Sequence, residues 1–187
     1  MRITGGSLRG RTLVAPEGRT TRPTSDRVRE ALLNILMHHD WGAAIGDPLV
    51  GARVLDAFGG TGALAFEALS RGAAHATLFD TDRQALKHIR ENAAALKITD
   101  DCAIMPADAT RPPQAAQPCT LVFLDPPYRK NLIPESLAAL GRAGWIAPHA
   151  LIVAETAKDE NLALPENHAV ALARTYGDTA VHFITLS

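Results

Sequence analysis

The sequence predicts an α/β fold in which a mostly parallel sheet is covered by helices on both faces. From residue 53 onward, short apolar runs alternate with segments of helical periodicity, the pattern of parallel strands joined by right-handed helical crossovers. Four of these apolar runs end at or near an aspartate. The length of 187 residues, with 47% hydrophobic and 21% charged residues, fits one globular domain with a short appendage.

Periodicity and turn residues place the elements along the chain. A helix is expected at 25–38, because Thr24 or Ser25 can cap it and its apolar residues repeat every three or four positions. The glycine-rich residues 40–52 form a loop. Strands are expected at 54–58, 76–79, 102–106, 120–124 and 150–155, helices at 63–70, 83–96 and 132–142, and a β-hairpin at 169–175 and 179–186.

The first 30 residues are locally basic, with seven arginines against three acidic residues, in a chain whose net charge is -1. Arginine suits bidentate contacts to phosphate, and Gly5-Gly6 lets the backbone approach a ligand closely. Residues 1–24 are therefore predicted to be an RNA- or DNA-binding arm or hairpin, although a merely solvated arm is the alternative. Because the arm has few apolar residues, we expect the core to begin near Arg53 without it. The expected RNA contacts are Arg2, Arg9, Arg11 and Arg22.

Acidic residues mark the candidate site. In an open α/β sheet, ligands bind beyond the carboxyl ends of the strands. Asp56, Asp80, Asp108 and Asp125 follow four consecutive predicted strands. One such acid would be an ordinary loop residue, whereas four in register are expected to line a single crevice.

A glycine loop, Gly59-Gly60-Thr61-Gly62, follows the first of these acids and suits close contact between backbone and cofactor. Residues 60–65 match the dinucleotide pattern G-x-G-x-x-A, with Asp80 at the expected distance, so a nicotinamide enzyme is one interpretation. Asp56 favours another, because a carboxylate ahead of the loop suits the cationic amino group of S-adenosylmethionine better than a pyrophosphate. The predicted cofactor-binding residues are Asp56, Phe58, Gly60, Gly62, Asp80 and Asp108.

The motif Asp125-Pro126-Pro127-Tyr128 follows the fourth strand. Its prolines remove two backbone donors, which leaves the Asp125 carboxylate and the Pro126 carbonyl as adjacent acceptors. Such acceptors can hold the hydrogens of an exocyclic NH2 group while its lone pair meets an electrophile. Tyr128 offers a flat face on which a base can stack, worth ~1–3 kcal/mol. Asp125, Pro126 and Tyr128 are therefore the predicted catalytic residues, with a structural Pro-Pro turn as the alternative.

Several other classes of protein are excluded by simple counts. No apolar run reaches 18 residues and no apolar signal segment is visible, so we expect neither a membrane span nor secretion. Cys102 and Cys119 are expected to be free thiols in a reducing cytoplasm. The seven histidines show no ligand spacing, so no metal is expected.

These motifs resemble the RsmD family, bacterial methyltransferases that modify a guanine N2 amine in small-subunit ribosomal RNA. D-P-P-Y is shared with other amino-group methyltransferases. More specific are the run R-P-T-S-D-R-V-R-E-A-L at 22–32 and the run E-A-L-S-R-G-A at 67–73. Further matches at 2–3, 5–11, 56–62 and 174–177 extend the resemblance over nearly the whole chain.

The resemblance implies a Rossmann-like class I methyltransferase fold at 25–187, with seven strands of which the last is antiparallel. It implies S-adenosylmethionine as cofactor and 16S ribosomal RNA as partner, at position 966 in the family's name and within an assembled small subunit. We expect Asp56 near the cofactor's amino group through water, Asp80 at its ribose hydroxyls and Asp108 at its adenine amine. Asp80 and Ala65 depart from the family's usual Glu and Gly, but neither touches the methyl-transfer site.

Alternatives of three kinds remain open from the residues alone. An adenine-N6 methyltransferase of DNA or RNA would share the cofactor and D-P-P-Y. An NAD-dependent oxidoreductase would share the glycine loop, and a non-catalytic RNA-binding assembly factor would share the basic arm. Glu155, at the end of the fifth strand, either borders the base pocket or is a solvated strand end.

Overall fold

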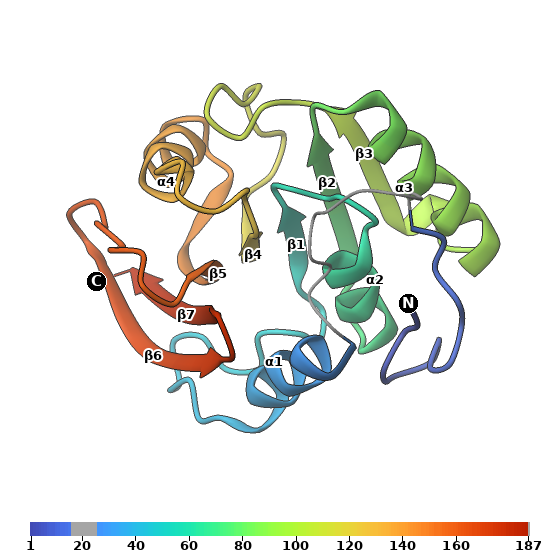
Figure 1. Ribbon diagram of the computed structural model, residues 1–187, viewed down its shortest axis with the longest axis horizontal. Coiled ribbons are helices and arrows are strands. Elements are labelled where there is room, and N and C mark those ends of the chain that lie inside the picture. Colours follow the sequence, from blue (N-terminus) through green and yellow to red (C-terminus); the bar gives the residue numbers. More distant parts are fainter. Residues whose placement is uncertain (16–25, 187) are drawn as a thin grey trace.

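The computed structural model describes residues 1–15 and 26–186, which form a seven-stranded sheet between two layers of helices (Figure 1). The strands are β1 (Arg53–Asp56), β2 (His75–Asp80), β3 (Cys102–Pro106), β4 (Cys119–Leu124), β5 (Ile146–Ala157), β6 (His168–Tyr176) and β7 (Thr179–Leu186). The helices are α1 (Asp26–His38), α2 (Ala63–Ser70), α3 (Arg83–Leu96), α4 (Leu132–Arg142) and the short 3-10 helix η1 (Thr99–Asp101).

The strand order is β3-β2-β1-β4-β5-β7-β6. Strands β1 to β5 pair in parallel, whereas β7 runs antiparallel to both of its neighbours. The predicted Rossmann-like sheet, mostly parallel with an antiparallel last strand, is confirmed. Because β1 lies between β2 and β4, the winding of the chain reverses beside β1, and this is the position at which open α/β sheets bind ligands.

Side-chain alternation along the strands builds a core on each face of the sheet. Val54 packs in one cluster with residues of α1, α2 and α3, and the next residue, Leu55, packs in a second cluster with residues of α4. Phe123 and Leu124 of β4 divide in the same way, because successive side chains of a strand point to opposite faces. Helices thus cover both faces, as predicted.

Residues 1–15 of the N-terminal arm belong to this core, so the expectation that the core begins near Arg53 without the arm is wrong. Residues 1–15 fold back on themselves around an antiparallel bridge between positions 2 and 12. Ile3 and Leu13 are buried in the cluster that contains α1 and α2. Two buried apolar side chains are enough to attach a short segment that is otherwise held by polar contacts. Amino-acid composition does not reveal such contacts. The RNA-binding role of the arm stays a prediction.

Hydrogen bonds from two helices hold the arm in place. On α2, the Ser70 hydroxyl donates to the Gly5 carbonyl (2.6 Å) and accepts from the Leu8 N–H (2.9 Å). On α3, the Asn92 amide bonds both backbone groups of Val14 (2.8 and 3.0 Å). Gly6 has a φ of 76°, and a Cβ there would lie 1.9 Å from the Ser70 carbonyl oxygen. The close approach that the glycine pair was expected to make to a ligand is therefore made to α2.

The element boundaries follow the sequence closely, with two informative differences. β1 ends at Asp56 instead of continuing to residue 58, because the chain already turns into the glycine loop. β5 begins at Ile146, earlier than expected, and its pairing with β4 shifts register before Leu151. Pro148 made that segment look unlike a strand in the sequence. Proline does occur in strands where the pairing of neighbouring strands is irregular. The proposed helix caps and Arg22 lie outside the described residues.

Within residues 1–15 and 26–186, no helix is both long and apolar enough to cross a membrane.

Candidate active site

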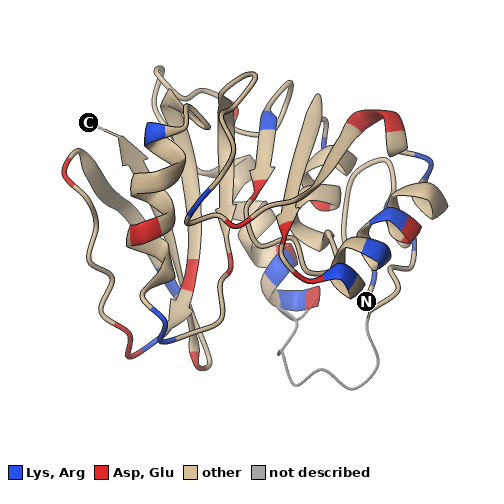
Figure 2. Ribbon diagram, turned by 90° about the horizontal axis from the view of Figure 1, so that it is seen from above, with Lys and Arg blue, Asp and Glu red and all other residues tan. Residues whose placement is uncertain are grey.

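The four strand-end acids lie together, as the sequence predicts. Asp56, Asp80, Asp108 and Asp125 all line one cleft of about 1080 Å³ at the carboxyl edge of the sheet. Phe58 and Gly60, which were predicted to bind the cofactor, and Pro126 and Tyr128, which were predicted to be catalytic, line the same cleft. Figure 2 shows acidic residues along this edge.

The structure shows why glycine is needed at three positions of the glycine loop. Gly59 is buried against β2, where an added Cβ would lie 2.9 Å from Ile89 and 3.1 Å from the Phe79 carbonyl. Gly60 and Gly62 both have positive φ, which favours glycine. Gly62 does not line the cleft; a Cβ there would lie 2.4 Å from the Phe66 ring. Its structural role is to let α2 start close to the loop, and its contact with a cofactor stays a prediction.

Asp80 fixes the glycine loop as well as facing the cleft. One carboxylate oxygen accepts the Gly60 N–H (2.9 Å), and the other accepts the Asp82 N–H (2.8 Å). Asp82 in turn caps α3 by accepting from Gln84 and Ala85. The exposed Asp108 is fixed locally by Thr110, which donates through both its N–H and its hydroxyl (2.8 Å each). Both predicted cofactor ligands are therefore pre-oriented at the rim.

Asp56 is the buried acid of the cleft, with 2% of its surface exposed. Its pKa is raised from 3.8 to about 7, chiefly because burial disfavours the charged form and further because Asp125 is nearby. Hydrogen bonds from the backbone of Phe58 and Ala65 oppose the shift. Its buried atom Oδ1 has no hydrogen-bond partner among the residues that the structure describes. A buried carboxylate oxygen without a donor fits a site completed by a cationic or N–H-bearing ligand.

The D-P-P-Y loop is fastened at two places. The Tyr128 hydroxyl and the Thr179 hydroxyl at the start of β7 are 2.9 Å apart. The next residue, Arg129, has a φ of 59°; its N–H donates to Glu160 (3.0 Å), and its guanidinium bonds both oxygens of Asp159 (3.1 Å). The ring of Tyr128 is thereby held in a set orientation at the cleft.

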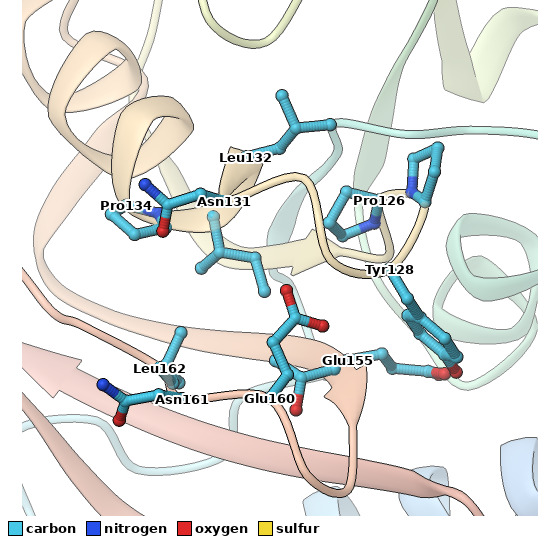
Figure 3. A pocket seen from close by; sticks show the side chains of 12 residues that line it. Pro126, Tyr128, Asn131, Leu132, Pro134, Glu155, Glu160, Asn161 and Leu162 are labelled. Atoms are coloured by element: carbon cyan, nitrogen blue, oxygen red, sulfur yellow. The ribbon is translucent and has the colours of Figure 1, made fainter.

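A small pocket lies beneath this loop, beside the cleft. It is lined by Pro126, Tyr128, Glu155, Thr156 and Glu160, among others. Figure 3 shows Glu155 extending from β5 toward Tyr128. Glu155 is 3% exposed, so the interpretation as a solvated strand end is wrong, and its place at the border of a base pocket stays a prediction.

Comparison with known proteins gives the family. The family model described as "Conserved hypothetical protein 95" matches residues 1–185. Ribosomal RNA small subunit methyltransferase D of Escherichia coli (strain K12) is 38% identical over 181 residues, which cover 96% of this chain and 87% of that protein. The Haemophilus influenzae protein of the same name is 35% identical over 95% of this chain and 89% of that protein. The solved structure of yhhF from Escherichia coli superposes with a TM-score of 0.83 and 36% identity, covering 100% of this chain and 98% of that one.

The chain belongs to the RsmD family. It is therefore a methyltransferase, and the interpretation of the glycine loop as a nicotinamide site is set aside. The class I methyltransferase fold inferred from the resemblance is confirmed by the sheet order and by the likeness to yhhF.

A buried ion network explains the two most specific sequence runs of this RsmD-family chain. Glu67 on α2 is fully buried and accepts from Arg29 on α1 (3.1 Å), from Arg71 one turn along α2, and from the Thr4 N–H of the arm (2.7 Å). Arg29 also donates to the carbonyl of Arg2 and lines the cleft. The network thus joins the arm, α1 and α2 beside the cleft. Sequence reasoning missed it, although a lone glutamate in the apolar helix ALAFEALS was a signal.

Three of the predicted RNA contacts, Arg2, Arg9 and Arg11, do not line the cleft. Arg2, Arg9 and Arg11 are exposed, and Arg11 also donates to the Ala95 carbonyl at the end of α3 (2.7 Å). Arg22 lies outside the described residues. Their contacts with RNA stay predictions.

Within the described ranges, no group of three or more His, Cys, Asp or Glu side chains is arranged to hold a metal ion. Cys102 is half-buried and Cys119 is buried, and both are free thiols.

Proposed function

We propose that this methyltransferase transfers a methyl group from S-adenosylmethionine to the N2 amine of a guanine in small-subunit ribosomal RNA. The observation that carries the proposal is the shared cleft, in which the acceptors of the D-P-P-Y loop face the glycine loop and its acids. The relatives named Ribosomal RNA small subunit methyltransferase D support ribosomal RNA as the substrate.

The residues of the cleft fit S-adenosylmethionine. The orphan oxygen of Asp56 suits the cationic amino group, directly or through water. Asp80 and Asp108 stand at the rim as acceptors for the ribose hydroxyls and the adenine amine. When bound, the cofactor supplies an electrophilic methyl group, so the protein needs no strong base.

The target amine is held by the D-P-P-Y loop. The Asp125 carboxylate and the Pro126 carbonyl accept the two N2 hydrogens, which orients the nitrogen lone pair toward the methyl group. Tyr128, held through its hydroxyl, stacks on a base that has been flipped out of its surroundings. Catalysis is then chiefly positioning. The proton that N2 loses after the transfer goes to Asp125.

The RNA surface extends from the arm onto α3. The arm contributes Arg2, Arg9 and Arg11, and α3 adds the exposed side chains of Arg83, Lys87 and Arg90, which lie on one side of that helix. Such a basic surface suits the phosphate backbone of RNA. We assign the assembled small subunit as the partner and, because that is where ribosomes are built, the cytoplasm as the location.

Two experiments test the proposal together. Calorimetric titration with S-adenosylhomocysteine should show tight binding, whereas no binding would contradict a methyltransferase role and favour a non-catalytic assembly factor. Asp125→Ala should keep that affinity but lower methyl transfer to small subunits by ~10²-fold or more, since it removes an acceptor used in the transition state. Near-normal turnover of the variant would remove Asp125 from the mechanism. Transfer to duplex DNA in place of small subunits would favour the adenine-N6 alternative.

A further inference from the structure

The side chain of Asn92 joins the N-terminal arm to the glycine loop. Asn92 lies on α3 and is 1% exposed. Its Oδ1 atom accepts the Val14 N–H of the arm (2.8 Å), and its Nδ2 group donates to the Val14 carbonyl (3.0 Å) and to the Thr61 carbonyl of the loop (3.0 Å). One buried amide thus uses its oxygen and one hydrogen on the arm and its other hydrogen on the loop.

Thr61 is the residue of the glycine loop at which the arm and the cleft meet. It lines the cleft, and its hydroxyl lies 3.5 Å from the sulfur of Met1 in the arm. One residue earlier, the Gly60 N–H is held by the Asp80 carboxylate (2.9 Å). The loop proposed to bind the cofactor is therefore fixed by side chains of two elements, Asp80 at the end of β2 and Asn92 on α3.

The arm is attached more lightly than the elements that it contacts. Ile3 and Leu13 anchor it in the core, and hydrogen bonds to α2 and α3 hold it in place (Figure 1). A short segment with few buried apolar contacts opens at a lower free energy than the core does. Only when the arm is docked does Val14 hold the Asn92 amide in the orientation that also bonds Thr61. Docking of the arm and ordering of the loop therefore favour one another.

We propose that Asn92 is a positioning residue that couples RNA binding on the arm to cofactor binding in the cleft. The inference rests on the proposed function, which assigns RNA to the arm and the cofactor to the loop. RNA that binds the docked arm keeps Asn92 oriented toward Thr61, and a cofactor that binds the ordered loop keeps the same amide oriented toward Val14. Each ligand should then raise the affinity of the other by the same factor, and such factors are typically about 5–150-fold.

The test measures the affinity for small subunits with and without saturating S-adenosylhomocysteine, which occupies the cleft but transfers no methyl group. The ratio of the two affinities is the coupling ratio, and it should be about tenfold for wild type. Asn92→Ala should reduce it to about twofold or less, because alanine bonds neither Val14 nor Thr61. A purely structural role would not give this result, since S-adenosylhomocysteine favours the folded protein and a general loss of stability would not lower the ratio.

Val14→Pro breaks the bridge on the side of the arm alone. Proline has no N–H, so the Asn92 oxygen loses its donor whereas the bond from Asn92 to the Thr61 carbonyl stays. This variant should bind S-adenosylhomocysteine as wild type does when small subunits are absent, but its coupling ratio should fall to about threefold or less. Asn34→Ala, at an exposed asparagine of α1, is the matched control and should keep the wild-type ratio.

Equal affinity of wild type for small subunits with and without S-adenosylhomocysteine would overturn the inference. A wild-type ratio in either bridge variant would overturn it as well, and Val14→Pro decides alone if Asn92→Ala does not fold. These results leave the proposed function standing as long as wild type methylates small subunits. Failure of wild type to bind S-adenosylhomocysteine or to methylate small subunits would overturn the proposed function, and the coupling with it.

Discussion

Asp56→Asn should stabilise the cofactor-free protein at neutral and higher pH. The pKa of Asp56 is raised from 3.8 to about 7 by burial and by Asp125. Above the unfolded pKa, the unfolded chain therefore binds fewer protons than the folded one, and stability falls as pH rises. The loss is complete just above the folded pKa and amounts to about 4 kcal/mol, at about 1.4 kcal/mol for each pKa unit.

The variant should remove this penalty without losing the local hydrogen bonds. The asparagine oxygen can still accept from the backbone of Phe58 and Ala65, which bond the carboxylate now. In urea unfolding, Asp56→Asn should exceed wild type in free energy of unfolding by a few kcal/mol at pH 8. At about pH 3 the two proteins should be nearly equal, because the carboxyl is then mostly protonated in both states.

Cofactor affinity should show the opposite ranking. The amino group of S-adenosylhomocysteine favours the ionised carboxylate, so wild-type affinity should rise by up to about tenfold per pH unit toward pH 7 and level off above it. Asp56→Asn should bind more weakly at pH 8, with little pH dependence below 7. If the variant gains no stability at pH 8, or if wild-type affinity is flat between pH 5 and 7, the assignment of a buried Asp56 with a raised pKa is refuted.

The remaining predictions concern the rim, the ion network and the arm. Asp80→Ala should weaken S-adenosylhomocysteine binding by ~10-fold or more with a smaller effect on turnover at saturation, because it removes the ribose acceptor and the tether of Gly60; unaltered affinity in calorimetry would discard the ribose assignment. Glu67→Gln should lower the free energy of unfolding by about 3–5 kcal/mol, because it leaves two arginines without their buried carboxylate partner. The control Glu91→Gln removes one carboxylate of an exposed pair with Lys87 and should cost less than about 0.5 kcal/mol. Similar losses of both variants in urea unfolding would count against the network. Arg9→Ala should lower the slope of log affinity for small subunits against log salt concentration by up to about one. The control Arg142→Ala changes an exposed residue at the end of α4 and should leave the slope unchanged. Equal slopes for both variants and wild type would mean that Arg9 contacts no phosphate.

The elements with a strong local pattern could be predicted from the sequence. The ranges 63–70, 83–96 and 132–142 agree with α2, α3 and α4, because helical periodicity and turn residues are local information. The first half of β5 could not be found, since Pro148 lies in it and only the irregular pairing with β4 makes it a strand.

The positions of the site residues could be predicted from the sequence better than their protonation and their interaction partners. A strand-end acid before a glycine loop indicates a ligand site, so Asp56 was found. Its raised pKa depends on burial and on Asp125, which no local pattern reveals. Glu67 and Arg29 are 38 positions apart, and their pairing exists only after α1 packs beside α2. For the same reason the arm looked separable in sequence, whereas Ile3 and Leu13 are buried in the fold.

The central claim is that this chain methylates the N2 amine of a guanine in small-subunit ribosomal RNA, and nucleoside analysis tests it most directly. Small subunits from a bacterium lacking its own family member are incubated with the protein and isotopically labelled S-adenosylmethionine. Their RNA is then digested to nucleosides and analysed by mass spectrometry against standards. The account predicts that the label appears in N2-methylguanosine with wild type and disappears with Asp125→Ala. Label in N6-methyladenosine or in another methylated nucleoside, or no label in the RNA, would contradict it.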